Sequence, residues 1–166
     1  MGLRFKYRDT VLDSERMSKG GFKRIVVAFD GSPDSVRAVK TACSIARGYD
    51  AKLTIVHVYS VPAISYATPA PIPQIDAGLL EESAREAGSK TLAKAKGLAA
   101  EAGVDAKFQL LESQSVVRAV LEFAEKEACD LIVVGTRGMT GFRRMILGSV
   151  SSGLVSHAHC PVLVVR

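Results

Sequence analysis

Residues 25–33 read Ile-Val-Val-Ala-Phe-Asp-Gly-Ser-Pro, and this stretch decides the fold. Its first five residues form a continuous apolar run, which is typical of a parallel strand buried on both faces. Asp30 and Gly31 are turn residues, and Ser32 followed by Pro33 predicts the N-cap and first turn of a helix. Apolar residues then recur at helical spacing, at Val36, Val39, Cys43 and Ala46. The stretch therefore predicts a strand that runs directly into a helix.

Strand and helix patterns alternate from residue 24 to the end of the chain. Strands that alternate with helices form a parallel sheet with right-handed crossovers and helices on both faces. We therefore expect one α/β domain, a doubly wound, Rossmann-like parallel sheet of five strands in the order 3-2-1-4-5. After the first strand and helix, further strands are predicted over residues 53–58, 106–111, 131–134 and 161–165, and helices over residues 80–103, 117–124 and 143–157.

The longest predicted helix and two segments without periodicity complete the outline. One stripe of this helix carries small and apolar residues, namely Leu80, Ala84, Ala87, Thr91, Ala95 and Leu98, and Gly103 should end it. Residues 60–77 carry four prolines, and a loop of this length is usually a lid, a binding loop or a disordered excursion. Residues 1–22 show neither the helical nor the strand period of apolar residues and are predicted to form a flexible N-terminal arm. Residues 23–166 are left as the domain.

Composition and charge predict a cytoplasmic protein that does not span a membrane. No apolar run approaches the ~20 residues that a membrane-spanning helix needs, and the N-terminus lacks the apolar region of a secretory signal. The net charge is +5, but much of the excess lies in residues 1–24 and no basic, aromatic-rich face follows, so nucleic-acid binding is not expected. Cys43, Cys129 and Cys160 form no CxxC pair and are predicted to be buried free thiols.

The predicted sheet also indicates where a ligand would bind. Doubly wound sheets bind ligands beyond the carboxyl ends of their strands, at the point where the strand order reverses. The positions to search are therefore residues 30–32, residues 58–61, and Gly135 onward. Gly135-Thr136-Arg137-Gly138 follows the 131–134 strand directly, and nine residues then separate Gly138 from Gly148-Ser149.

Glycines at these positions allow the backbone to approach a ligand closely and to turn its N–H groups toward it. Residues 148–151 would begin a helix or lie in its first turns, and would present N–H donors, hydroxyls and a positive dipole end to an anion. Arg137, Arg143 and Arg144 add positive charge nearby. We call residues 135–138 and 148–151 the glycine cradle and expect it to bind phosphate. The chain lacks the Gly-Lys-Ser/Thr sequence of a Walker A loop. It also lacks a GxGxxG sequence after its first strand, so a dinucleotide site is not expected.

The spacing Gly135-x2-Gly138-x9-Gly148-Ser149 resembles the G-x2-G-x9-G-(S/T) motif of the ATP-binding members of the universal stress protein family. Residues 25–32 and 157–165 are also similar to this family, so the resemblance covers roughly residues 23–166. It implies an ATP-binding protein whose nucleotide carries Mg²⁺ or Mn²⁺. The glycine motif is the most specific part of the resemblance, because many members of the family lack it and do not bind ATP.

The resemblance also implies a role for individual residues. Backbone groups around Ala28 and Val58 would contact the adenine, and Asp30 would lie near the ribose and phosphates and help hold the metal ion. The alternative for Asp30 is a helix cap. The residues that would wrap the ribose and phosphates are Val134, Gly135, Thr136, Arg137, Gly138, Met139 and Thr140. Those that would hold the β- and γ-phosphates are Gly148, Ser149, Val150 and Ser151.

Three functions are compatible with this sequence. The first is a regulatory, stress-response module in which ATP occupancy changes conformation or the binding of an unidentified protein partner. The resemblance implies a homodimer that pairs through the last strand, Pro161 to Val165. The second is a slow ATP-hydrolysing or adenylating enzyme, since residues 30–35 distantly resemble the phosphate loop of ATP pyrophosphatases. The third is a nucleotide-independent interaction module. No catalytic residue is predicted, His57 is expected to be a core histidine, and we expect a binding protein.

Overall fold

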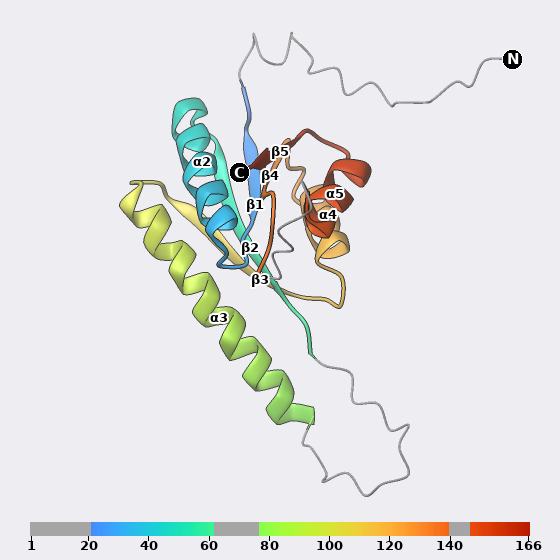
Figure 1. Cartoon of the computed structure of the whole chain (residues 1–166). Helices are drawn as coiled ribbons and strands as arrows, with labels where there is room; N and C mark the ends of the chain where they lie inside the picture. The colour runs from blue at the N-terminus through green and yellow to red at the C-terminus, as the bar shows by residue number, and fades with distance from the viewer. Residues whose placement is uncertain (1–20, 62–76, 140–146) are drawn as a thin grey trace, which may run out of the picture.

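The computed structural model describes residues 21–61, 77–139 and 147–166, and confirms the predicted α/β fold (Figure 1). Its parallel five-stranded sheet has the order β3-β2-β1-β4-β5. Residues 1–20 of the predicted arm and the proline-rich residues 62–76 lie outside the described residues. The elements are β1 (Arg24–Ala28), α2 (Pro33–Tyr49), β2 (Lys52–Tyr59), α3 (Ala77–Glu101), β3 (Ala106–Glu112), α4 (Val116–Lys126), β4 (Leu131–Gly135), α5 (Ser149–His157) and β5 (Val162–Val165).

The sheet is covered on both faces, as the apolar strands predict. Helices α2 and α3 lie on one face, and α4 and α5 lie on the other (Figure 1). In the central strand β1, Ile25 and Val27 contribute to the core under α2 and α3, whereas Val26 contributes to the core under α4 and α5. All three are at most 1% exposed, because a central parallel strand is buried on both faces. None of the described helices is long and apolar enough to cross a bilayer.

Capping at the start of α2 follows the sequence prediction. The Ser32 side-chain oxygen accepts a hydrogen bond from the Ser35 N–H at 3.2 Å, and Pro33 occupies the first turn. Ser115 caps α4 in the same way, by accepting from the Arg118 N–H at 3.3 Å. These caps fix the first turn of each helix next to the carboxyl end of the preceding strand.

Two predicted helices differ in detail from the structure. The stripe of α3 that faces the sheet is Gly88, Leu92, Ala95 and Ala99, and the predicted Ala87 is exposed. Small residues lie on several sides of this helix, so the sequence pattern hardly distinguishes its buried face from its exposed faces. The last helix is expected over residues 143–157, and α5 begins at Ser149, because Gly148 is extended (φ −74°, ψ 166°) and donates its N–H to the Thr136 carbonyl. Residues 143–146 lie outside the described residues.

The cysteines are free and buried, as predicted. Cys43 lies in the core under α2 and α3, and Cys129 and Cys160 lie in the core on the opposite face. Burial raises the pKa of Cys129 and of Cys160 to about 11 in each case. Both thiols are therefore protonated and unreactive at neutral pH.

Candidate functional site

A cavity of about 260 Å³ opens at the carboxyl ends of β1, β2 and β4, where the strand order reverses between β1 and β4. All the predicted site residues line it except Met139 and Thr140. Met139 is 74% exposed, and Thr140 lies outside the described residues. The cavity is lined by Ala28, Phe29, Asp30, Ser35, Val56, His57, Val58, Val116, Val134, Gly135, Thr136, Arg137, Gly138, Gly148, Ser149, Val150 and Ser151.

Several lining residues escaped the sequence prediction. Phe29 directly follows β1, and Val56 and His57 lie in the C-terminal half of β2, so the rule that ligands bind at carboxyl ends of strands gives a signal for them. Ser35 and Val116 lie in the first turns of α2 and α4. Together with Ala28 and Val58, the valines make one wall of the cavity apolar, whereas the glycine cradle makes the other wall polar.

The N-terminus of α5 faces the cavity. Gly148 is its N-cap, and no side chain in the described ranges caps this end, so the first-turn N–H groups and the positive end of the helix dipole suit an anion. The Gly148 N–H donates to the Thr136 carbonyl at 2.7 Å. The Ser151 hydroxyl lies 3.1 Å from the same carbonyl and is buried. The two halves of the glycine cradle, which are distant in sequence, are thus joined at Thr136.

Asp30 connects the end of β1 to the first half of the glycine cradle. One carboxylate oxygen accepts the Ser32 N–H at 2.9 Å, and the other accepts the Met139 N–H at 3.1 Å. Ser32 is the N-cap of α2, and Asp30 supports the same helix end by accepting the Ser32 N–H, as its alternative role predicts. The carboxylate lines the cavity and keeps free lone pairs, since each oxygen can accept more than one hydrogen bond.

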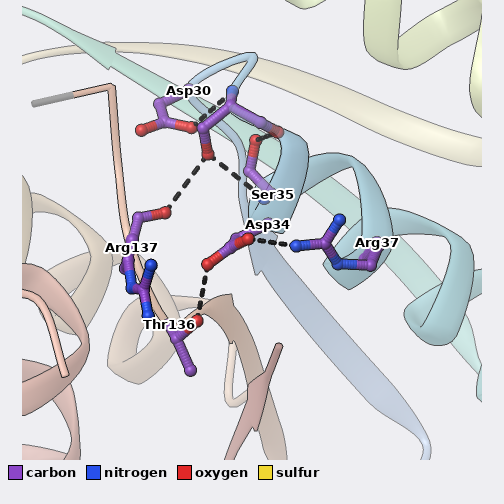
Figure 2. A network of polar contacts seen from close by, with 7 residues as sticks. Asp30, Asp34, Ser35, Arg37, Thr136 and Arg137 are labelled. Carbon is purple, nitrogen blue, oxygen red and sulfur yellow. Dashed lines mark hydrogen bonds and ion pairs between the residues drawn. The ribbon is translucent and has the colours of Figure 1, made fainter. Parts of the chain in front are cut away.

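Thr136 lines the cavity and takes part in a network of polar contacts (Figure 2). Its hydroxyl donates to Oδ2 of Asp34 at 2.5 Å, and Arg37 forms an ion pair with the same carboxylate. The hydrogen bond from Thr136 is the main cause that lowers the pKa of Asp34, against the opposing effect of burial. The Ser32 hydroxyl donates to the Arg137 carbonyl at 3.2 Å, which adds a second link between α2 and the glycine cradle.

Arg137 brings an unsatisfied donor to the cavity. Its side-chain Nε is buried and has no hydrogen-bond partner among the residues that the structure describes. A buried, unpartnered N–H of a cation is costly, so its position in the cavity lining suits an anionic ligand. The predicted neighbours Arg143 and Arg144 lie outside the described residues.

Asp30, the acidic side chain of the cavity lining, fits a metal ion that arrives with phosphate. Residues 21–61, 77–139 and 147–166 contain no group of three or more His, Cys, Asp or Glu side chains that could hold an ion by themselves. Mg²⁺ commonly takes one or two carboxylates and completes its shell with phosphate oxygens and water. Asp30 could supply the carboxylate in such a shell.

The three histidines each donate to a backbone carbonyl. His57 Nδ1 donates to the Phe29 carbonyl at 2.7 Å, so this ring nitrogen is satisfied, but the residue is half-buried and lines the cavity and is not part of the buried core. His157 Nδ1 donates to Gly153 at 2.9 Å, and His159 Nε2 donates to Cys129 at 3.2 Å. His157 and His159 are therefore engaged with separate parts of the backbone.

Comparison with known proteins gives one consistent family. Residues 21–166 match the family model described as "Universal stress protein family". A universal stress protein of Methanocaldococcus jannaschii is 40% identical over 145 residues, which cover 87% of this chain and 82% of the relative. The crystal structure of a universal stress protein in complex with cAMP is 30% identical, with a TM-score of 0.63, and the match covers 89% of this chain and 98% of that chain. The structure of UspA from Lactobacillus plantarum has a TM-score of 0.70 at 28% identity, over 89% and 99% of the two chains. With the fold and the glycine motif, these matches show that the chain belongs to the universal stress protein family.

Proposed function

We propose that the cavity binds ATP, together with Mg²⁺ or Mn²⁺, and that its occupancy regulates the conformation or partner binding of this protein. One observation carries the proposal. The N-terminus of α5, which no side chain among the described residues caps, and Arg137, whose buried Nε has no hydrogen-bond partner among those residues, both line the same cavity. Both features favour a ligand with several negative charges. The complex of a relative with cAMP supports an adenine nucleotide as the ligand class.

The two walls of the cavity suggest the orientation of the nucleotide. Ala28, Val58 and Val116 would enclose the adenine, because a flat aromatic base gains most from an apolar surface. The first-turn N–H groups of α5, that of Ser151 included, and the hydroxyl of Ser149 would hold the terminal phosphates. Asp30 would lie between the two, near the ribose and the metal ion.

The same proposal includes a homodimer. Strand β5 is an edge of the sheet, all its residues are apolar, and each is only partly buried. An apolar edge strand is prone to pair with another chain, and a second copy of β5 would cover it. The Thr136 N–H donates to the Val165 carbonyl at 2.8 Å, which links the glycine cradle to the end of this strand. Through this link, nucleotide occupancy could shift the equilibrium between monomer and dimer, or change a surface that binds a partner.

The test is to denature freshly purified protein and to identify the released nucleotide by chromatography. The wild type should release intact ATP, and Gly138→Val should release none while remaining folded by circular dichroism. Gly97→Val is the matched control, because no atom lies within 4 Å of a Cβ placed there. ADP, or AMP with pyrophosphate, formed on incubation would favour an enzyme instead. No nucleotide in the wild type, and no binding on titration with ATP and Mg²⁺, would contradict the proposal.

A further inference from the structure

Asp34 lies outside the cavity lining but against the glycine cradle. It is in the first turn of α2, and its side chain is 14% exposed. A Cβ placed on Gly135 would come within 2.7 Å of the Asp34 backbone carbonyl carbon and 2.9 Å of its Cβ. The first turn of α2 is thus in direct contact with the first residue of the glycine cradle. Asp34 is therefore close enough to set the position of the cradle without touching a ligand.

The side chain of Asp34 holds the residue on which both halves of the cradle depend. Thr136 donates its hydroxyl to Asp34 at 2.5 Å, while its carbonyl accepts the N–H of Gly148 at 2.7 Å and lies 3.1 Å from the Ser151 hydroxyl. Thr136 is 8% exposed, so water cannot readily replace these partners. A shift of Thr136 would consequently move the N-terminus of α5 relative to Gly138.

We infer that Asp34 is a positioning residue for nucleotide binding: through Thr136 it holds the two halves of the glycine cradle at the separation that the phosphates require. This inference rests on the proposed function. A carboxylate beside an anion site would by itself weaken the binding of phosphate. Its charge is offset by the ion pair with Arg37, so the hydrogen bond to Thr136 is retained at little electrostatic cost.

A general stabilising role at the helix N-terminus is the competing explanation, because any acidic residue there interacts favourably with the helix dipole. The two explanations differ for Asp34→Asn. An asparagine keeps an oxygen that can accept from Thr136 but loses the charge that the dipole favours. The positioning role therefore predicts that Asp34→Asn keeps nucleotide affinity even where it lowers stability. A purely stabilising role predicts that nucleotide affinity is the same whether or not a variant keeps the hydrogen bond between Thr136 and residue 34.

The experiment is a double-mutant cycle on ATP affinity, measured by calorimetry in the full chain with Mg²⁺ at a temperature where every variant is folded. Asp34→Ala and Thr136→Val should each weaken binding about tenfold, and the double variant should be no weaker than either single one. Asp34→Asn should stay within about threefold of wild type, because the acceptor for the Thr136 hydroxyl remains. Arg37→Ala keeps this hydrogen bond but leaves the Asp34 charge without its ion-pair partner, so it should weaken binding less than Asp34→Ala does. Wild-type affinity in Asp34→Ala, or additive losses in the double variant, would overturn the positioning role while leaving the proposed function intact.

A measurement without nucleotide separates the two proposals. Amide hydrogen exchange reports the hydrogen bond from Gly148 to the Thr136 carbonyl directly. The Gly148 N–H should exchange at least about tenfold faster in Asp34→Ala and Thr136→Val than in wild type, and at an unchanged rate in Asp34→Asn. The central amides of β1 should not change. Equal exchange at Gly148 in all variants would overturn the positioning role even if the wild type bound no nucleotide.

Discussion

A Cβ atom on Gly138 would lie 2.7 Å from Oδ2 of Asp30, so residue 138 must be a glycine for the carboxylate to keep its place. Oδ2 is the oxygen that accepts the Met139 N–H, and the other oxygen accepts the Ser32 N–H. The glycine motif therefore has a structural reason beyond access for a ligand. It allows the end of β1 and the loop after β4 to share one carboxylate.

Replacement of Gly138 by alanine should accordingly weaken ATP binding. The methyl group would displace the Asp30 carboxylate and break its bond to Met139, and we expect a loss of affinity of about tenfold, the equivalent of one hydrogen bond to a charged group. Calorimetric titration with ATP and Mg²⁺ measures it. Gly97→Ala, an open site on α3, should bind as the wild type does. If Gly138→Ala and Gly97→Ala bind ATP equally well, ATP binding does not require the Asp30 carboxylate in its present position.

Two glycines on α3 should respond to alanine in opposite directions. A Cβ on Gly88 would lie 2.9 Å from Leu110 Cδ1 and 3.3 Å from His57 Cδ2, whereas one on Gly97 would meet nothing within 4 Å. Gly97→Ala should raise the free energy of unfolding by about 1 kcal/mol through helix propensity. Gly88→Ala should lower it by about 1 kcal/mol, because overpacking exceeds that gain. Urea denaturation of both variants tests this, and stabilisation by Gly88→Ala would show that α3 can move away from the sheet at low cost.

Arg137 should contribute to phosphate binding and not to base binding. Its buried Nε has no partner in the described parts of the chain, and a phosphate oxygen would satisfy it. Arg137→Met, which keeps the apolar stem, should weaken ATP binding about tenfold and leave adenosine binding within about twofold. Competition binding with both ligands measures the difference. A similar loss for ATP and adenosine would place the side chain against the base instead.

Stability should fall at alkaline pH because of two buried thiols. The folded-state pKa values of Cys129 and Cys160 are raised to about 11 from an ordinary value of 9.0. A raised pKa contributes stability that is complete below pH 9 and is lost as the pH rises toward 11, since the unfolded chain releases the protons first. The loss should be about 2 kcal/mol per thiol. Guanidinium denaturation between these pH values should show a shallower decline in Cys129→Ala and Cys160→Ala, and an unchanged slope would contradict the assignment.

The proposed dimer can be tested at the edge strand. Val164→Glu places a charge on β5 and should convert a dimer to a monomer in sedimentation velocity, because a charge at an apolar edge opposes pairing. Circular dichroism checks that the variant is folded. Leu79→Glu, at a position that is 64% exposed on α3, is the control and should leave the mass unchanged. A wild-type mass for Val164→Glu would exclude pairing through this strand.

Much of the fold could be predicted because its signals are local. The continuous apolar run of β1, the Ser32 cap and Pro33 are read directly from neighbouring residues, and the alternation of strands and helices then restricts the topology. For the last helix, propensity predicted a start near Arg143, whereas the glycine motif allowed a start within residues 148–151, and α5 begins at Ser149. The hydrogen bond from Gly148 to Thr136 was not predicted, because it joins segments whose proximity only the fold establishes.

The candidate site shows the same division between local and distant contacts. The glycine spacing and the strand ends identified most of the cavity lining, including Asp30 and Gly148. The sequence did not reveal that Thr136 turns its side chain to Asp34, because the two residues lie 102 positions apart. Nor did it reveal that Gly88 is buried for close packing, since a glycine within a helix gives no apolar signal.

The most direct test of the central claim is to titrate ATP and Mg²⁺ into nitrogen-labelled protein and follow its backbone amide signals by NMR. Binding in the cavity predicts large shifts for Gly135 to Met139 and for Gly148 to Ser151, with small shifts at the opposite end of the sheet, around Arg24 and Asp130. Adenosine should shift the signals of Ala28 and Val58 but those of Ser149 and Ser151 much less. No shifts at saturating ATP, or shifts confined to residues away from the glycine cradle, would contradict the account.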